Sequence, residues 1–92
     1  MSDFLGQLIA LIADRKINPK AGSYTNQLLA DPAKAAQKVG EEAVEVVVAA
    51  LAQSKSRLVE EMADLIYHSL VLLESQGVSW AEVMAELERR HK

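Results

Sequence analysis

The sequence contains no cysteine, and aromatic residues make up only 4% of its 92 positions. Without cysteine, neither a disulfide framework nor thiolate chemistry is possible. Ten basic residues stand against thirteen acidic ones, so the net charge is -3 and the basic patch of a nucleic-acid-binding protein is missing. No apolar run reaches the roughly 18 residues of a membrane span, and the start of the chain lacks the basic region of a signal peptide. We therefore expect a cytoplasmic protein that binds neither nucleic acid nor a membrane.

The hydrophobic half of the sequence consists mainly of small and medium aliphatic residues: alanine, valine and leucine. Side chains of this size suit helices that pack at short range. A length of 92 residues is enough for one domain with a small core, so we interpret residues 1–92 as a single domain. So small a domain with so many apolar positions is expected to bury more of them by pairing with a second chain.

Capping residues, prolines and glycines mark where helices begin and end. The sequence predicts helices over residues 3–14, 23–30, 31–53, 54–76 and 79–90, with a loop over residues 15–23. The third helix is rich in valine, which favours strands, but its acidic residues keep a period of 3.6 and its flanks are rich in alanine. Because this helix is apolar nearly all round, it is expected to be buried. The predicted fold class is all-α, an antiparallel helical bundle of four to five helices that dimerisation completes.

Charged side chains form one stripe on each of the two long helices. The first stripe, within an arc of about 100°, contains Lys38, Glu41, Glu42 and Glu45. The second stripe, at spacings i, i+4, i+7 and i+11, contains Arg57, Glu61, Asp64 and His68. The short connection between these helices makes them antiparallel neighbours, so the two stripes are expected to face one another.

The carboxylates of these stripes repel one another, and partial burial strengthens the repulsion because ionised groups lose hydration. Protonation or a bound cation relieves it. Glu42, Glu45, Glu61 and Asp64 offer only oxygen ligands, which suit Mg²⁺ or Mn²⁺ rather than zinc or copper. One such motif alone is more often a solvated acidic face with a few salt bridges, but two on adjacent apolar helices favour a metal site. His68 is expected to be a partner of these acids rather than a ligand.

A lysine beside a magnesium site indicates a phosphorylated substrate. Mg²⁺ shares its coordination between carboxylates and substrate phosphates, and Lys38 would add a positive charge for a phosphate. Ser23 begins the short helix, where its hydroxyl either caps the helix or, with free N–H groups, binds an anion. These residues together predict metal-dependent phosphoryl or pyrophosphoryl chemistry without identifying the substrate.

Two sets of residues resemble the motifs of a known superfamily. Lys38-x-x-Glu41-Glu42-x-x-Glu45, followed by Glu61-x-x-Asp64, is similar to the EExxE…ExxD signature of the MazG-like all-α nucleotide pyrophosphohydrolases. Two further segments resemble the phosphoribosyl-ATP pyrophosphatase branch of that superfamily. They are Ser23-Tyr24-Thr25 with Leu28-Leu29, and Ala63-Asp64-Leu65-Ile66-Tyr67-His68. The resemblance covers the chain from about Leu8 to its end.

This resemblance implies a Mg²⁺-dependent, all-helical homodimer that converts phosphoribosyl-ATP to phosphoribosyl-AMP and pyrophosphate, the second step of histidine biosynthesis. The metal ligands that it implies are Glu42, Glu45, Glu61 and Asp64. Glu41 would be a further ligand or would orient the attacking water, and Lys38 would hold phosphate. The substrate contacts that it implies are Ser23, Tyr24 and Thr25.

Two other functions stay open on the sequence. One is a house-cleaning pyrophosphatase of the same superfamily, which acts on non-standard nucleoside triphosphates, although Ser23-Tyr24-Thr25 favours the phosphoribosyl-ATP branch. The other is a non-enzymatic helical dimerisation module. Such a module would explain the apolar helices but not the acids at matching spacing.

Overall fold

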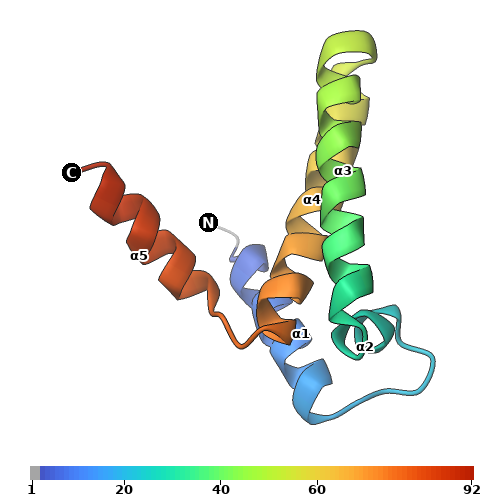
Figure 1. Cartoon of the computed structure of the whole chain (residues 1–92), viewed down its shortest axis with the longest axis vertical. Helices are drawn as coiled ribbons and strands as arrows, with labels where there is room; N and C mark the ends of the chain where they lie inside the picture. Colours follow the sequence, from blue (N-terminus) through green and yellow to red (C-terminus); the bar gives the residue numbers. More distant parts are fainter. Residues whose placement is uncertain (1–2) are drawn as a thin grey trace.

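The computed structural model describes residues 3–92, and in this part of the chain it contains five α-helices and no strand (Figure 1). The helices are α1 (Phe4–Ile17), α2 (Tyr24–Leu29), α3 (Pro32–Ala52), α4 (Lys55–Ser75) and α5 (Trp80–Arg90). None of these described helices is both long and apolar enough to cross a membrane. The predicted all-α class is confirmed, and each predicted helix is present.

Each helix begins where a side-chain oxygen accepts a hydrogen bond from a backbone N–H three residues later. The capping residues are Asp3, Ser23, Asp31, Ser54 and Ser79. The cap of α4 is Ser54, whose side chain accepts from the Arg57 N–H at 3.2 Å. The start of α5 is a capping box, in which Glu82 Oε2 also accepts a hydrogen bond from the Ser79 N–H at 2.7 Å.

The first helix is longer than its sequence pattern predicts. α1 ends at Ile17 rather than near Asp14, so the loop expected from residue 15 begins later. The last turn of α1 contains Arg15 and Lys16, whose positive charges interact favourably with the carboxyl end of a helix. The helix stops at Asn18, whose Nδ2 donates to Asp14 Oδ1 at 2.9 Å.

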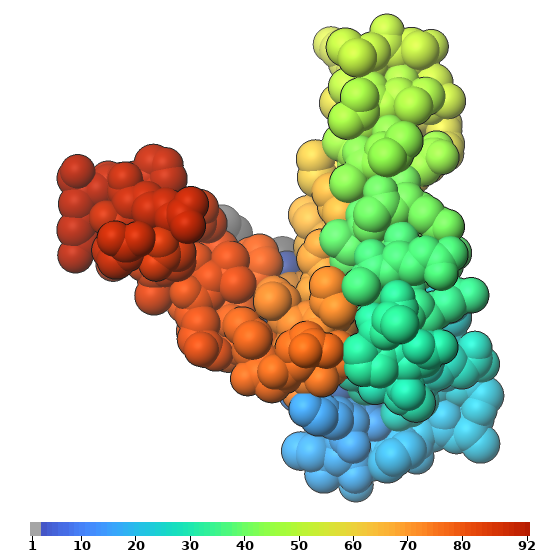
Figure 2. All heavy atoms as spheres, in the orientation of Figure 1, coloured from blue at the N-terminus to red at the C-terminus, as the bar shows by residue number. Residues whose placement is uncertain are grey.

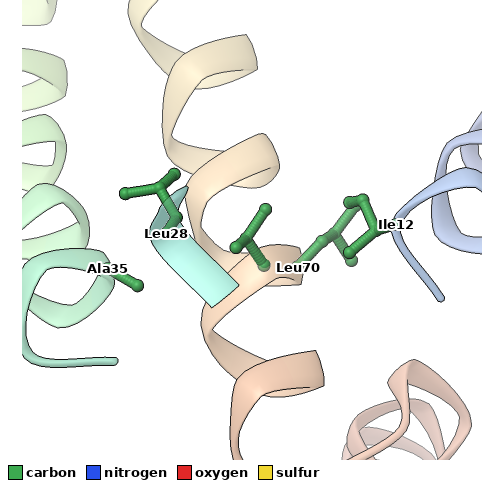
Figure 3. Packing of buried hydrophobic residues seen from close by; sticks show 5 residues of the cluster. Ile12, Leu28, Ala35 and Leu70 are labelled. Atoms are coloured by element: carbon green, nitrogen blue, oxygen red, sulfur yellow. The ribbon is translucent and has the colours of Figure 1, made fainter. Parts of the chain in front are cut away.

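The hydrophobic core lies where α1 and α2 pack against the inner half of α3 and α4 (Figure 1). Its buried side chains are Ile12, Leu28, Ala35, Leu70 and Val71. Figure 3 shows Leu70 of α4 between Ile12 on one side and Leu28 and Ala35 on the other. Each of the fully buried side chains of Ile12, Leu28 and Val71 stabilises the fold by roughly 1.5–3 kcal/mol. Four helices therefore share one core, which fixes α2 beside α4.

α3 and α4 form a long antiparallel hairpin, as predicted, and its outer half projects away from the core (Figure 1). The apolar circumference of α3 predicts a buried helix, but this prediction is wrong for the single chain. Within α3 only Ala35 and Ala49 are buried. α4 covers one side of α3, and the opposite side stays in contact with solvent.

Two apolar stripes are exposed on the hairpin, and we call them the hairpin stripes. On α3 the exposed residues are Val44, Val47, Val48 and Leu51. On α4 they are Val59, Met62 and Ile66. Both sets keep a helical spacing of three or four residues, so each forms a continuous strip along its helix.

The last helix, α5, extends away from the other four beyond Trp80, its first residue, which packs against the core. It contains no buried residue, and Figure 2 shows an open angle between it and the α3–α4 hairpin. Of the four to five helices expected in the bundle, four pack together in the single chain.

Candidate metal centre

Three carboxylates converge between the two long helices. One oxygen each from Glu42 of α3 and from Glu61 and Asp64 of α4 can be chosen so that all lie within 4.8 Å of one another. The spacing i, i+3 places Glu61 and Asp64 on the same face of α4. The antiparallel hairpin then brings Glu42 opposite them. We call these three residues the carboxylate cluster.

The cluster lies at the edge of the seam between the helices rather than deep inside it. Glu61 is buried, with 7% of its surface exposed, Glu42 is half-buried, and Asp64 is exposed. A ligand can therefore reach the cluster from solvent on the side of Asp64. The buried side of the cluster has lost the water that would otherwise stabilise its negative charges.

The charges of the cluster destabilise one another. Burial, then hydrogen bonding with Glu61 and the negative charges of Asp64 and Glu61, raises the pKa of Glu42 above its ordinary value. The raised pKa means that the ionised form of Glu42 is unfavourable in the isolated chain. A cation among the three carboxylates would reverse this effect. Oxygen-only donors at this spacing fit a metal ion, and the three residues of the cluster could hold it.

Arg57 fixes the buried carboxylate of the cluster. Its two terminal nitrogens form ion pairs with Glu60 and Glu61, one on each. The guanidinium thus holds Glu61 in one orientation and offsets part of the negative charge. Glu60 anchors Arg57 in turn. The spacing of Arg57 to Glu60, i to i+3, was visible in the sequence, but sequence reasoning missed Glu60.

Three other predicted site residues, all on α3, lie outside the carboxylate cluster. Glu45 is exposed, one helical turn further along α3 than Glu42. Glu41 is also exposed, and its Oε2 accepts a hydrogen bond from Gln37 at 3.1 Å. Lys38 Nζ lies 3.7 Å from Glu41 Oε1. The Gln37 hydrogen bond and the nearby lysine charges hold the pKa of Glu41 below its ordinary value.

His68 lies beside the cluster and is buried. Its Nδ1 is 2.9 Å from the backbone oxygen of Asp64 and 4.0 Å from Glu42 Oε1. On the other side of the ring, Nε2 is 3.1 Å from the hydroxyl of Tyr24. His68 therefore connects both helices of the cluster with α2, as a neighbour of the acids.

The three predicted substrate contacts at the start of α2 already make hydrogen bonds within the chain. Ser23 Oγ accepts from the Asn26 N–H at 3.2 Å and caps the helix. The Tyr24 hydroxyl bonds to His68, and Thr25 Oγ1 lies 2.5 Å from the hydroxyl of Tyr67. Sequence reasoning missed Tyr67 as a partner. A role of these residues in binding substrate stays a prediction.

Comparison with known proteins identifies the family. Residues 5–91 match the family model described as phosphoribosyl-ATP pyrophosphohydrolase, a span that contains the whole cluster. The phosphoribosyl-ATP pyrophosphatase of Metallosphaera sedula is 53% identical over the full length of both chains. That of Pyrobaculum islandicum is 54% identical over 96% of this chain and 95% of its own. That of Caulobacter vibrioides is 50% identical over 98% of this chain and 84% of its own. A match across nearly the whole chain shows that it belongs to the phosphoribosyl-ATP pyrophosphohydrolase family.

Proposed function

We propose that this protein hydrolyses phosphoribosyl-ATP to phosphoribosyl-AMP and pyrophosphate, in the second step of histidine biosynthesis, in the cytoplasm. The observation that supports this most is the convergence of Glu42, Glu61 and Asp64 between α3 and α4. Membership of the family supplies the substrate, because its members named above act on phosphoribosyl-ATP. The cluster supplies the chemistry that a polyphosphate substrate requires.

We propose Mg²⁺ as the metal, with Mn²⁺ as the alternative, because hard oxygen donors prefer these ions. A divalent cation at this position stabilises the negative charge of a phosphate chain and makes a water molecule more acidic. Glu42, Glu61 and Asp64 hold the ion, and Arg57 keeps the Glu61 carboxylate in place. Glu45 lies one turn away on the same helix and is proposed as a further ligand.

The remaining charged residues of α3 would act on the substrate and on the water. Lys38 is half-buried and close to the cluster in sequence, so its ammonium group can neutralise a phosphate oxygen. Glu41 keeps its charge at low pH because its pKa is lowered. An ionised carboxylate orients a water molecule by accepting a hydrogen bond from it. We therefore propose Glu41 as the residue that orients the attacking water.

We also propose a homodimer. The hairpin stripes leave valine, leucine, isoleucine and methionine side chains in contact with water on both long helices. Continuous apolar strips of this kind mark contact surfaces more often than free surface. A second copy would cover them with a matching surface about a two-fold axis.

Substrate assays are expected to distinguish the three candidate functions. With Mg²⁺, the purified protein should release pyrophosphate from phosphoribosyl-ATP, and only slowly or not at all from a panel of deoxynucleoside triphosphates. Liquid chromatography would follow phosphoribosyl-AMP directly. Activity on the panel alone would indicate a house-cleaning pyrophosphatase. No turnover of either, together with no Mg²⁺ binding by calorimetry, would indicate a dimerisation module.

Stability is expected to depend on pH through Glu42. Folding raises the pKa of Glu42, so the folded chain binds this proton more tightly than the unfolded chain does. The contribution to stability is therefore full below the ordinary carboxyl pKa, and it is lost as the pH rises through the raised value. Without metal, the melting temperature of wild type should therefore fall relative to that of Glu42→Gln as the pH rises. Mg²⁺ should stabilise wild type above this range and not the variant. Parallel melting curves at every pH would contradict the prediction.

A further inference from the structure

Beyond the metal ligands, we infer that His68 is a positioning residue that joins Tyr24 of α2 to the carboxylate cluster. This inference rests on the proposed function, because it takes the cluster to be the metal site. His68 does not need to touch substrate or metal in this role. It acts through Asp64 and Glu42, and Tyr24 acts through His68.

The ring of His68 contacts three helices at once. Nδ1 faces the Asp64 carbonyl of α4 at 2.9 Å and Glu42 Oε1 of α3 at 4.0 Å. Nε2 faces the Tyr24 hydroxyl of α2 at 3.1 Å. Only 7% of the His68 surface is exposed, so water cannot replace these contacts easily. Both ring nitrogens therefore have defined partners.

The direction of these hydrogen bonds follows from the partners. A backbone carbonyl has no proton to give, so Nδ1 carries the hydrogen and donates it to the Asp64 oxygen. In the neutral ring Nε2 is then an acceptor, and the Tyr24 hydroxyl donates to it. Glu42 Oε1 lies 4.0 Å from the same nitrogen. The Asp64 carbonyl thus fixes the tautomer, and the Tyr24 hydroxyl holds the ring by donating to Nε2.

Aromatic packing holds the ring at this angle. The rings of Tyr24 and His68 meet edge to face at 89°, with centroids 5.9 Å apart. The rings of Tyr67 and His68 also meet edge to face, at 72° and with centroids 5.1 Å apart. Such contacts restrict rotation of the imidazole. The hydroxyl of Tyr24 adds a directional contact at Nε2, which helps to keep Nδ1 on the side of the cluster.

A second hydrogen bond between the same helices provides a control. Thr25 Oγ1 and the Tyr67 hydroxyl lie 2.5 Å apart and tie α2 to α4 one residue before His68 on α4. In the described part of the chain, the Tyr67 hydroxyl bonds to Thr25 and not to a carboxylate of the cluster. Removing this hydroxyl should weaken the packing of α2 without changing the surroundings of the metal.

Calorimetric titration of the full chain with Mg²⁺ alone tests the inference. Tyr24→Phe removes only the hydroxyl, and His68→Asn keeps a donor near the position of Nδ1 but has nothing at Nε2. Each is expected to weaken Mg²⁺ binding by roughly 10-fold, the usual effect of losing an outer partner of a metal ligand. Tyr67→Phe should leave the Kd for Mg²⁺ within about twofold of wild type while lowering the melting temperature. Equal losses of Mg²⁺ affinity in all three variants would overturn the inference, because they would indicate a general loosening of the fold.

The double variant Tyr24→Phe/His68→Asn shows whether Tyr24 acts through His68. If it does, the double variant binds Mg²⁺ about as tightly as His68→Asn alone. Additive losses would overturn the connection, and so would unchanged Mg²⁺ affinity in the single variants. Failure of wild type to bind Mg²⁺ would instead refute the proposed metal site, so the two failures are distinguishable. Circular dichroism of each variant confirms that the helices are retained.

Discussion

Replacing Asp64 by asparagine is expected to lower kcat/KM for phosphoribosyl-ATP by roughly 100-fold or more, with the helices intact. A 100-fold loss corresponds to about 2.7 kcal/mol of transition-state stabilisation. Asp64 is exposed, and asparagine has the same shape, so the substitution removes a charged ligand without disturbing the core. Pyrophosphate release at saturating Mg²⁺ measures the effect, and circular dichroism reports the helices.

The same substitution has an opposite effect on the metal-free chain. The negative charge of Asp64 is one cause of the raised pKa of Glu42, so its removal relieves repulsion in the cluster. Without Mg²⁺, Asp64→Asn should therefore melt at the same temperature as wild type or higher. With Mg²⁺, only wild type should gain stability, because a ligand that binds the folded state stabilises it. This combination separates a metal ligand from a residue that merely supports the fold.

The matched control is Glu88→Gln, which removes one exposed carboxylate from α5. It changes the net charge of the chain as Asp64→Asn does, but it lies on the helix that stands apart from the cluster. Its turnover should equal that of wild type. Normal turnover by Asp64→Asn at limiting Mg²⁺ would refute the assignment of this cluster as the catalytic metal site.

The helices and their starts could be read from local chemistry. Each capping side chain stands next to the residues that it caps, so Asp31 before a proline and the Ser79–Glu82 pair are recognisable without knowledge of the fold. α1 was predicted too short, although residues 15–17 contain no glycine or proline that would stop a helix. Asn18 was the usable signal, since its side chain bonds back to Asp14.

The candidate site was only partly predictable. The spacing of Glu61 and Asp64 fixes their common face, and the short connection brings Glu42 opposite them. Which of the α3 acids meets α4 depends on the rotation of α3 about its axis, and that is set by packing in the core. Sequence periodicity does not determine this rotation, so it could not show whether Glu42 or Glu45 faces Glu61 and Asp64. The link from His68 to α2 was hidden for the same reason.

Periodicity also cannot say what covers an apolar surface. The sequence pattern shows that α3 is apolar on nearly every side. A helix in a core and a helix in a dimer interface both have this property. The single chain covers only one side of α3 and leaves Val44, Val47 and Val48 exposed. In Figure 1, α5 points away from the α3–α4 hairpin. The surplus of apolar surface was therefore predictable, but its location on the outer hairpin was not.

Introducing a charge into the stripe on α3 is expected to dissociate the proposed homodimer. In Leu51→Glu, a side chain that is 83% exposed in the single chain would carry a carboxylate into the contact between two copies. Burying an unpaired charge costs several kcal/mol, so the dimer should weaken by roughly 1000-fold. Light scattering after gel filtration should show a fall from about twice the chain mass of 10.1 kDa to that mass.

Ile17→Glu is the control for this experiment, because Ile17 is 77% exposed but lies at the end of α1, outside the hairpin stripes. It should remain a dimer. A wild-type protein that is monomeric at every concentration would contradict the proposed assembly. A Leu51→Glu variant that stays dimeric would place the interface elsewhere, with the exposed Leu87 of α5 as the next residue to change.

The monomeric variant also shows how far one chain can perform the chemistry. All three carboxylates of the cluster come from the same chain, so Leu51→Glu should still bind Mg²⁺ with an affinity near that of wild type. If Mg²⁺ binding is kept but turnover is lost, the partner contributes to substrate binding rather than to the metal site. If Mg²⁺ binding disappears together with the dimer, the hairpin needs its partner to hold Glu42 opposite Glu61 and Asp64.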